Sequence, residues 1–206
     1  MLSSLSPFFC AHCIHCRLPQ THCVCSQIEH IELPFNISLC CHSKEWQRND
    51  NTGQWALLSS QHIRRIRWHR KPELISPTLS TTDLTAAAGH YLLFPSDDAE
   101  DLQQLFEKTT QTIAQPITQL WVIDGTWQEA QKMLRQSPWL KALPKVKIQP
   151  SQGQSLESLF QLRRNQQGLC TLEAIEAALI VPTPLAAQAL KRNFHLFQNT
   201  LLGLLR

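Results

Sequence analysis

The sequence has no long hydrophobic run. None of its apolar stretches approaches the roughly 20 residues that a membrane-spanning helix requires. Residues 1–9 also lack the basic start and the continuous apolar segment of a secretory signal, so we expect a soluble, cytoplasmic protein. Internal repeats and low-complexity linkers are absent as well. A chain of 206 residues therefore fits one domain with a small appendage.

An excess of positive charge is also lacking. The formal net charge of +3 permits an anionic partner but is too small to require nucleic acid. The basic residues are nevertheless concentrated in residues 62–71, where Arg64, Arg65 and Arg67 are candidate phosphate contacts and Trp68 is suited to base stacking. A charge run is equally often a solvated face, so both interpretations stay open.

Cysteine, in contrast, is abundant and clustered. Disulfides are not expected in a cytosolic chain, yet Cys13 and Cys16 form one close pair and Cys23 and Cys25 form a second, six residues further on. Two such pairs allow four thiolates to converge tetrahedrally on zinc. Because four thiolates complete the coordination sphere, we predict a structural zinc site that cannot activate water.

An iron–sulfur cluster is the alternative interpretation of this segment. Cys10, Cys13 and Cys16 repeat the spacing of a bacterial iron–sulfur run, which needs a fourth cysteine at position 20 and then a proline. Position 20 is Gln20, so zinc is favoured. The three histidines nearby are interpreted as solvated neighbours of the metal site.

Apolar runs and helical patterns alternate along the rest of the chain. Strands are predicted at residues 33–41, 91–94, 120–123 and 145–148. Helices are predicted at residues 52–60, from an N-cap at Ser96 to about 110, at 126–135, at 171–181 and from there to about 202. This alternation predicts an α/β fold with a mostly parallel sheet and helices on both faces.

The turn after the third of these strands is the main candidate site. Asp124 stands at the carboxyl end of an apolar strand, where open α/β sheets bind their ligands. Gly125 permits a tight turn, and the helix that begins near Thr126 exposes backbone N–H groups to an anionic ligand. Taken alone, Asp124 and Thr126 could be helix caps and Trp127 a core residue. The strand-end position and the cysteine pairs upstream favour a functional site.

Four motifs occur together and in order. They are Cys13-x-x-Cys16 with Cys23-x-Cys25, Asn51-Thr52-Gly53, Asp124-Gly125-Thr126-Trp127, and Cys170-Thr171-Leu172-Glu173-Ala174. In this combination the sequence resembles the DTW-domain family of tRNA-uridine aminocarboxypropyltransferases, from about Cys13 to the C-terminus. One departure is Cys170, where the family more often has serine. We divide the chain into a zinc module at residues 1–30 and a catalytic domain at residues 31–206.

The resemblance implies a reaction and a fold. The donor would be S-adenosylmethionine, the acceptor a uridine in tRNA, and the products 3-(3-amino-3-carboxypropyl)uridine and methylthioadenosine. The fold would be a knotted one like that of the SPOUT methyltransferases, an exception to the rule that chains avoid knots. Two alternatives are an RNA methyltransferase of related fold, which would release S-adenosylhomocysteine, and a non-catalytic zinc-containing RNA-binding module, which would not need Asp124.

Roles for individual residues follow as hypotheses. Uracil N3 carries a proton and is then a poor nucleophile, so Asp124 is the candidate general base. Trp127 is expected to contact the methyl group and to attract the sulfonium by about 0.5–2 kcal/mol. Other candidate residues are Gly125, Thr126 and Thr171 for the cofactor, and Arg163 and Arg164 as a second contact with RNA.

Overall fold

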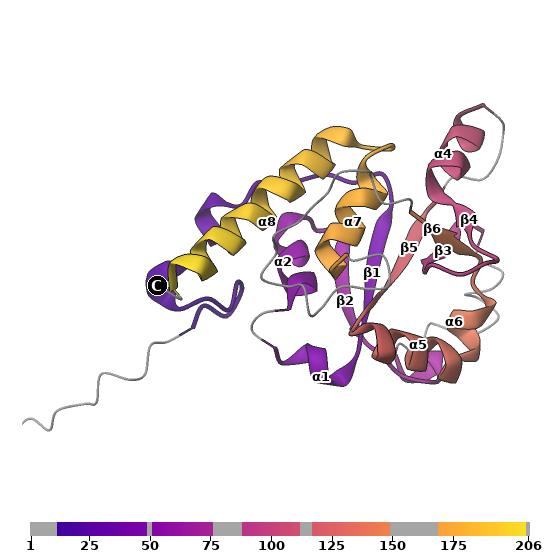
Figure 1. Cartoon of the computed structure of the whole chain (residues 1–206), viewed down its shortest axis with the longest axis horizontal. Helices are drawn as coiled ribbons and strands as arrows, with labels where there is room; N and C mark the ends of the chain where they lie inside the picture. Colours follow the sequence, from indigo (N-terminus) through magenta and orange to yellow (C-terminus); the bar gives the residue numbers. More distant parts are fainter. Residues whose placement is uncertain (1–11, 49–50, 76–87, 112–116, 149–168, 205–206) are drawn as a thin grey trace, which may run out of the picture.

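A parallel β-sheet forms the centre of the protein. The computed structural model describes residues 12–48, 51–75, 88–111, 117–148 and 169–204. Within this part of the chain, six strands pair in the order β2-β1-β5-β3-β6-β4, and every pair is parallel (Figure 1). The strands are β1 (Asn36–Cys41), β2 (Ile63–Arg67), β3 (His90–Leu93), β4 (Glu100–Asp101), β5 (Gln119–Asp124) and β6 (Lys145–Lys147). The predicted parallel sheet is confirmed.

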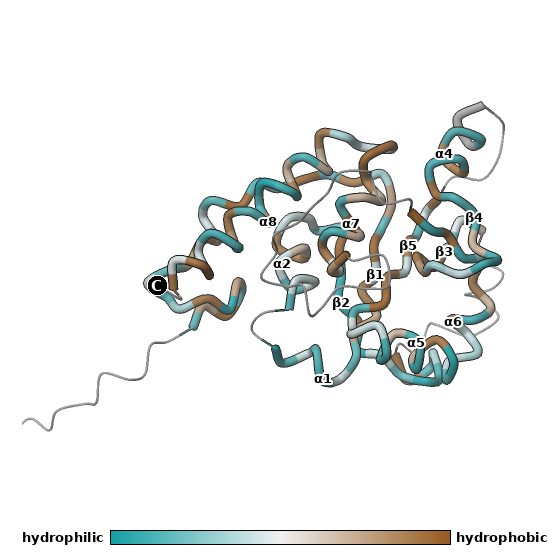
Figure 2. Tube along the Cα trace, viewed as in Figure 1, coloured by the Kyte–Doolittle hydropathy of each residue, from teal (hydrophilic) through white to brown (hydrophobic). Residues whose placement is uncertain are grey.

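Helices cover both faces of this sheet. They are α1 (Ser43–Trp46), α2 (Thr52–Ser59), α4 (Leu102–Gln111), α5 (Trp127–Gln136), α6 (Pro138–Ala142), α7 (Thr171–Leu179) and α8 (Pro184–Leu204). One core joins Leu39 and Leu120 of the sheet to α2, α7 and α8, and a second joins Trp121 to α5 and α6. The apolar colour of β1 and β5 between these helices reflects this two-sided burial (Figure 2). Among the described helices, none combines the length and hydropathy needed to cross a membrane.

The strand register positions the turn after β5. Cys41 at the end of β1 pairs with Asp124 at the end of β5, and the backbone N–H of His42 donates to the Asp124 carbonyl at 2.9 Å. From β1 the chain continues to β2 on one side, whereas from β5 it continues past β3 to β6 on the other. Neighbouring strands whose connections leave in opposite directions create a crevice at their carboxyl ends.

Two local predictions differ from the structure. Residues 63–67, expected only as a basic stretch, form the edge strand β2, because charged side chains are tolerated at a sheet edge. Helix α4 begins at Leu102, so the predicted N-cap at Ser96 is wrong. Asp101 is the cap, since its Oδ1 accepts from the backbone N–H groups of Gln103 at 3.0 Å and Gln104 at 3.1 Å.

The N-terminal segment packs against the C-terminal helix. Arg192 of α8 forms an ion pair with Glu29, and Asn193 donates to the Glu29 carbonyl at 2.8 Å. Buried residues from Cys13 to Ile28 belong to the same core as α8 and the sheet. The division of the chain at residue 30 stays a prediction. The knotted topology also stays an expectation, because residues 149–168, which join β6 to α7, lie outside the described part.

Candidate functional site

Asp124 is the centre of a buried polar network. Its side chain is almost inaccessible to solvent, and both of its oxygens lie 3.1 Å from Nδ2 of Asn51. Thr171 Oγ1 donates to Oδ1 at 2.9 Å, and Nη2 of Arg65 lies 3.6 Å from Oδ2. The carboxylate at the end of β5 is thus held by the first residue of α7, the N-cap of α2 and a guanidinium from β2.

The orientation of Asn51 follows from its role as a helix cap. Its Oδ1 accepts from the backbone N–H of Gln54 at 2.8 Å, so the amide nitrogen must face the acidic groups. This nitrogen donates to Glu45 Oε2 at 3.1 Å as well as to Asp124. Burial raises the pKa of Glu45, and the hydrogen bond from Asn51 opposes that shift. Asn51 therefore stabilises two neighbouring carboxyl groups with one amide group.

Gly53 allows α2 to approach this carboxylate closely. A Cβ atom on Gly53 would lie 3.0 Å from Asp124 Oδ2 and 3.1 Å from its Cγ. A side chain at this position would push the Asp124 carboxyl group by a few tenths of an ångström. The Asn51-Thr52-Gly53 motif thus needs a glycine because the backbone of α2 passes close to the Asp124 carboxyl group.

Gly53→Ala should lower turnover while leaving the helix intact. Alanine favours a helix interior by about 1 kcal/mol over glycine, whereas a reacting group that is moved by a few tenths of an ångström loses part of its alignment with the substrate. We expect a rate at least about tenfold lower with little loss of thermal stability. Gly203→Ala in α8 is the matched control, because no atom lies within 4 Å of its Cβ position. Equal rates for the two variants would show that the contact at Gly53 has no catalytic importance.

Thr126 belongs to a second hydrogen-bond network, next to the network around Asp124. It is the N-cap of α5 and forms a capping box with Glu129, whose Oε2 accepts from Thr126 N and Oγ1 at 3.0 Å each. His42 Nδ1 lies 3.2 Å from Glu129 Oε1, and the His42 ring stacks on Trp68. The first turn of α5 is therefore held by two contacts of Glu129, one with Thr126 and one with His42.

Two adjoining pockets lie at the carboxyl ends of the strands. The polar pocket is lined by Glu45, Asn51, Thr52, Asp124, Gly125, Thr126 and Thr171. The apolar pocket is lined mainly by apolar side chains, among them Phe94, Val122, Ile123 and Trp127. Gly125 and Thr171 line both pockets. The predicted catalytic and cofactor residues are thus brought together.

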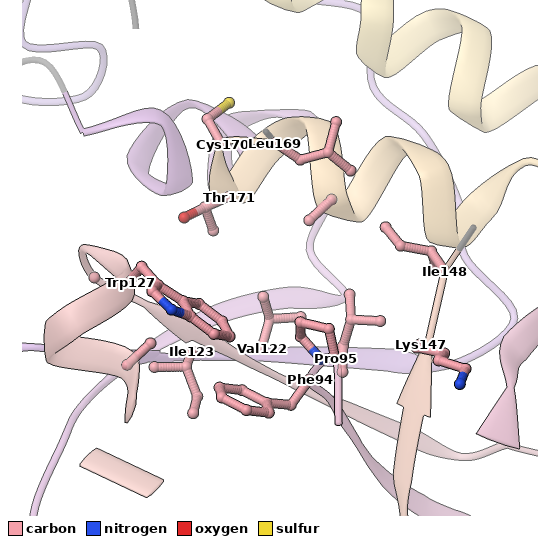
Figure 3. A pocket seen from close by; sticks show the side chains of 14 residues that line it. Phe94, Pro95, Val122, Ile123, Trp127, Lys147, Ile148, Leu169, Cys170 and Thr171 are labelled. Atoms are coloured by element: carbon pink, nitrogen blue, oxygen red, sulfur yellow. The ribbon is translucent and has the colours of Figure 1, made fainter. Parts of the chain in front are cut away.

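Aromatic and aliphatic side chains form the walls of the apolar pocket. Trp127 stacks on Phe94 with ring centroids 5.2 Å apart, and both lie opposite Leu169 and Thr171 (Figure 3). Among the described residues that line this pocket, Lys147 is the one that carries a charge. Sequence reasoning missed Phe94 and Leu169. The signal for Phe94 was its position directly after β3, at the same edge of the sheet as Asp124.

The structure separates the three arginines of β2. Arg64 and Arg67 are exposed; Arg64 Nε donates to Ser38 Oγ at 2.9 Å, and Arg67 stacks on Trp46. The side chain of Arg65 is only 5% exposed and lies beside Asp124. It donates to Trp46 O at 3.1 Å, Glu45 O at 2.7 Å, Gln54 Oε1 at 3.1 Å and Cys41 Sγ at 2.9 Å. Of the predicted RNA contacts, Arg65 therefore faces the interior, while Arg163 and Arg164 lie outside the described residues.

The four predicted cysteines converge. The Sγ atoms of Cys13, Cys16, Cys23 and Cys25 all lie within 4.8 Å of one another. The pair from Cys13 to Cys25 is 3.7 Å apart and the pair from Cys16 to Cys23 is 3.8 Å apart. A tetrahedral ion with metal–sulfur bonds of about 2.3 Å places its ligands about 3.8 Å apart, so the cluster fits zinc. Cys10 lies outside the described residues.

The pKa values of three of these thiols are shifted, and not all in the same direction. Backbone N–H groups of Cys16 and His15 lower the pKa of Cys13 to about 6, whereas burial raises the pKa values of Cys16 and Cys25. Four adjacent thiolates repel one another unless a metal ion neutralises them. The histidines His12, His15 and His22 are exposed and outside the cluster.

Fold and site together define an α/β protein with a ligand pocket at a strand-end crevice and a four-cysteine cluster that could hold a metal ion. The sequence model of the DTW domain matches residues 10–202. The chain therefore belongs to the DTW-domain family, the tRNA aminocarboxypropyltransferase family, as its motifs predicted. Membership indicates a tRNA-modifying transferase. No solved structure matches the chain.

Proposed function

We propose that the protein transfers the 3-amino-3-carboxypropyl group of S-adenosylmethionine to N3 of a uridine in tRNA. One observation carries this proposal. The Asp124-Gly125-Thr126-Trp127 turn of a DTW-family chain lies at the junction of an apolar and a polar pocket. A donor with an apolar adenosyl end and a charged amino acid end matches that division. Because tRNA is the proposed substrate, a cytoplasmic location is part of the same proposal.

The pockets assign a task to each part of the donor. The adenosyl group would occupy the apolar pocket, with Trp127 against the methyl group and the sulfonium. Gly125 and Thr171, which line both pockets, then lie beside the transferred chain, and the polar pocket receives its amino acid end together with uracil N3. This arrangement presents the propyl carbon to N3 and shields the methyl carbon, so positioning selects which group moves.

The chemical step exchanges one bond for another. The N3 electron pair forms a bond to the propyl carbon while the bond from that carbon to sulfur breaks, and the sulfonium becomes the neutral thioether of methylthioadenosine. The N3 proton passes to Asp124. Thr171 donates to the Asp124 carboxylate, and rotation of its hydroxyl would free one oxygen lone pair for this proton.

Zinc has a structural role in this proposal. Cys13, Cys16, Cys23 and Cys25 would hold it, and their four thiolates would leave no position for water or substrate. The metal would therefore contribute folding free energy and no chemistry.

The by-product is the decisive measurement. Purified protein is incubated with unmodified tRNA and S-adenosylmethionine, and nucleosides and small molecules are analysed by mass spectrometry. We expect the aminocarboxypropyl mass on uridine together with an equal amount of methylthioadenosine. S-adenosylhomocysteine with a methylated nucleoside would instead identify a methyltransferase. Tight tRNA binding with neither by-product would identify a non-catalytic RNA-binding protein.

The exposed arginines of β2 should contribute to tRNA affinity. Replacing Arg64 and Arg67 with glutamine removes two candidate phosphate contacts, so the slope of log K against log salt should fall by about 2 and binding should weaken on any tRNA. Donor binding should not change. Arg192→Gln, which removes an exposed arginine from α8, is the control. An unchanged salt slope in the double variant would identify Arg64 and Arg67 as a solvated face.

A further inference from the structure

Arg17, within the four-cysteine segment, has an unusual backbone conformation. Among the described residues it is the one non-glycine residue with a positive φ angle, at 61°. The loop is closed by hydrogen bonds from Cys13 N to Leu18 O at 2.8 Å and from Arg17 N to Cys13 O at 2.9 Å. A left-handed conformation is unfavourable for a non-glycine residue, so an arginine here needs a compensating interaction.

The side chain of Arg17 supplies that interaction. Its Nη1 donates to Trp46 O at 3.1 Å and to Arg48 O at 2.9 Å, so it caps the carboxyl end of α1. Arg65 donates to the same Trp46 carbonyl, at 3.1 Å. Helix α1 has only four residues, and a helix of one turn is not stable without such external partners.

The same loop also holds α2. Gln54 Nε2 donates to His15 O at 3.2 Å, and Trp55 Nε1 donates to Cys16 O at 3.2 Å. Trp55 is fully buried and stacks on Phe197 of α8 with ring centroids 4.7 Å apart. Three consecutive residues of the cysteine loop, His15 to Arg17, therefore contact the two helices that follow β1.

These two helices position Glu45 and Asn51, two of the polar side chains near Asp124. Glu45 lies in α1 and Asn51 caps α2, and the amide of Asn51 bonds both carboxyl groups. Two sets of contacts thus connect the cysteine cluster to the Asp124 carboxylate. In the first, the loop contacts α1 and α2. In the second, side chains positioned by these helices contact Asp124 or its partner Asn51. Both sets consist of hydrogen bonds of 2.9 to 3.2 Å.

We propose that the loop from Cys13 to Arg17 braces the active site, with Arg17 as a positioning residue for Glu45 and Asn51. The cysteine cluster then has a role beyond the stability of its own segment: it holds the polar pocket in shape. Arg17 touches neither donor nor tRNA in this role. The turnover part of the inference rests on the proposed function, whereas the ordering of α1 and α2 does not.

The variant Arg17→Gly tests the contacts of the Arg17 side chain with α1 without disturbing the fold of the cysteine loop. Glycine adopts the positive φ without strain, so the cysteine loop should keep its conformation while both hydrogen bonds to α1 are lost. We expect unchanged zinc content, faster amide hydrogen exchange in α1 and the first turn of α2, and turnover lower by roughly 10–10²-fold at saturating donor and tRNA. Arg17→Lys, which keeps one donor group, should give an intermediate rate. Ile14→Ala, at a residue that is 85% exposed in the same loop, should change none of these quantities.

The outcomes distinguish this proposal from the proposed function. Wild-type hydrogen exchange in α1 and α2 of Arg17→Gly would overturn the brace, and so would a loss of zinc, which would make Arg17 part of the metal site's own fold. If the wild-type protein modifies no uridine, the proposed function fails, yet hydrogen exchange still decides whether Arg17 orders α1. Faster exchange with full turnover would show that the contacts order α1 without positioning the site.

Discussion

Asp124→Asn is expected to abolish most uridine modification. Asparagine cannot accept the N3 proton, and the contribution of a general base is typically about 10²–10⁴-fold. Binding of S-adenosylmethionine, measured by calorimetry, should weaken far less than turnover, because the apolar pocket proposed for the adenosyl group does not include this side chain, although the polar pocket proposed for the amino acid end does. The loss should therefore appear in the maximal rate at saturating substrates.

The network around Asp124 predicts an additional cost in stability. If the amide nitrogen of the new asparagine takes the place of Oδ2, it faces two other donors, Nη2 of Arg65 and Nδ2 of Asn51. A buried donor without an acceptor costs about 1–3 kcal/mol, so the melting temperature should fall by several degrees while the protein stays folded at 25 °C. Asp97→Asn, at an exposed position, is the control. A wild-type rate for Asp124→Asn would show that the carboxylate is structural.

Cys16→Ser should have the largest effect on folding. Cys16 is fully buried and its Sγ lies 3.8 Å from that of Cys23, so the serine hydroxyl would replace a thiolate at the centre of the cluster. Structural zinc binds with about 10–16 kcal/mol, which is comparable to the whole stability of a domain. We expect loss of bound zinc and a melting temperature lower by about 10 °C or more, if the variant folds at all.

Cys40→Ser is the matched control for this change. Cys40 is equally buried, but it lies in the second core, between the sheet and helices α5 and α6. The same substitution there should cost only the burial of a hydroxyl, about 1–3 kcal/mol, and leave one zinc per chain. Zinc measured at full occupancy in Cys16→Ser, or iron measured in the wild-type protein, would contradict the assigned metal site.

The features that the sequence revealed are those with a local signal. Apolar runs identified the strands of the sheet centre, and the spacing of the four cysteines identified their cluster. Asp124 could be found because a polar residue at the end of an apolar strand is informative in a parallel sheet.

The features that could not be predicted depend on which face of a strand a side chain occupies and on contacts between residues far apart in the sequence. Arg65 is one of several arginines in a row, and only its place in β2, beside Cys41 and Trp46, buries it against Asp124. Glu45 lies in a polar stretch that looks like a loop, yet Asn51 and Arg65 bring it inside. Neither position has a sequence pattern that distinguishes it from a solvated charge.

The contact between the two ends of the described chain also determines when the protein can finish folding. Trp55 has Cys16 on one side and Phe197 on the other, and Glu29 is held by Arg192 and Asn193 of α8. During synthesis the cysteine segment leaves the ribosome well before α8, the helix that covers it. Pairing of such distant segments is slow, because a long loop must close before any contact is gained. The nascent chain would therefore carry every described active-site residue before it could bury Trp55.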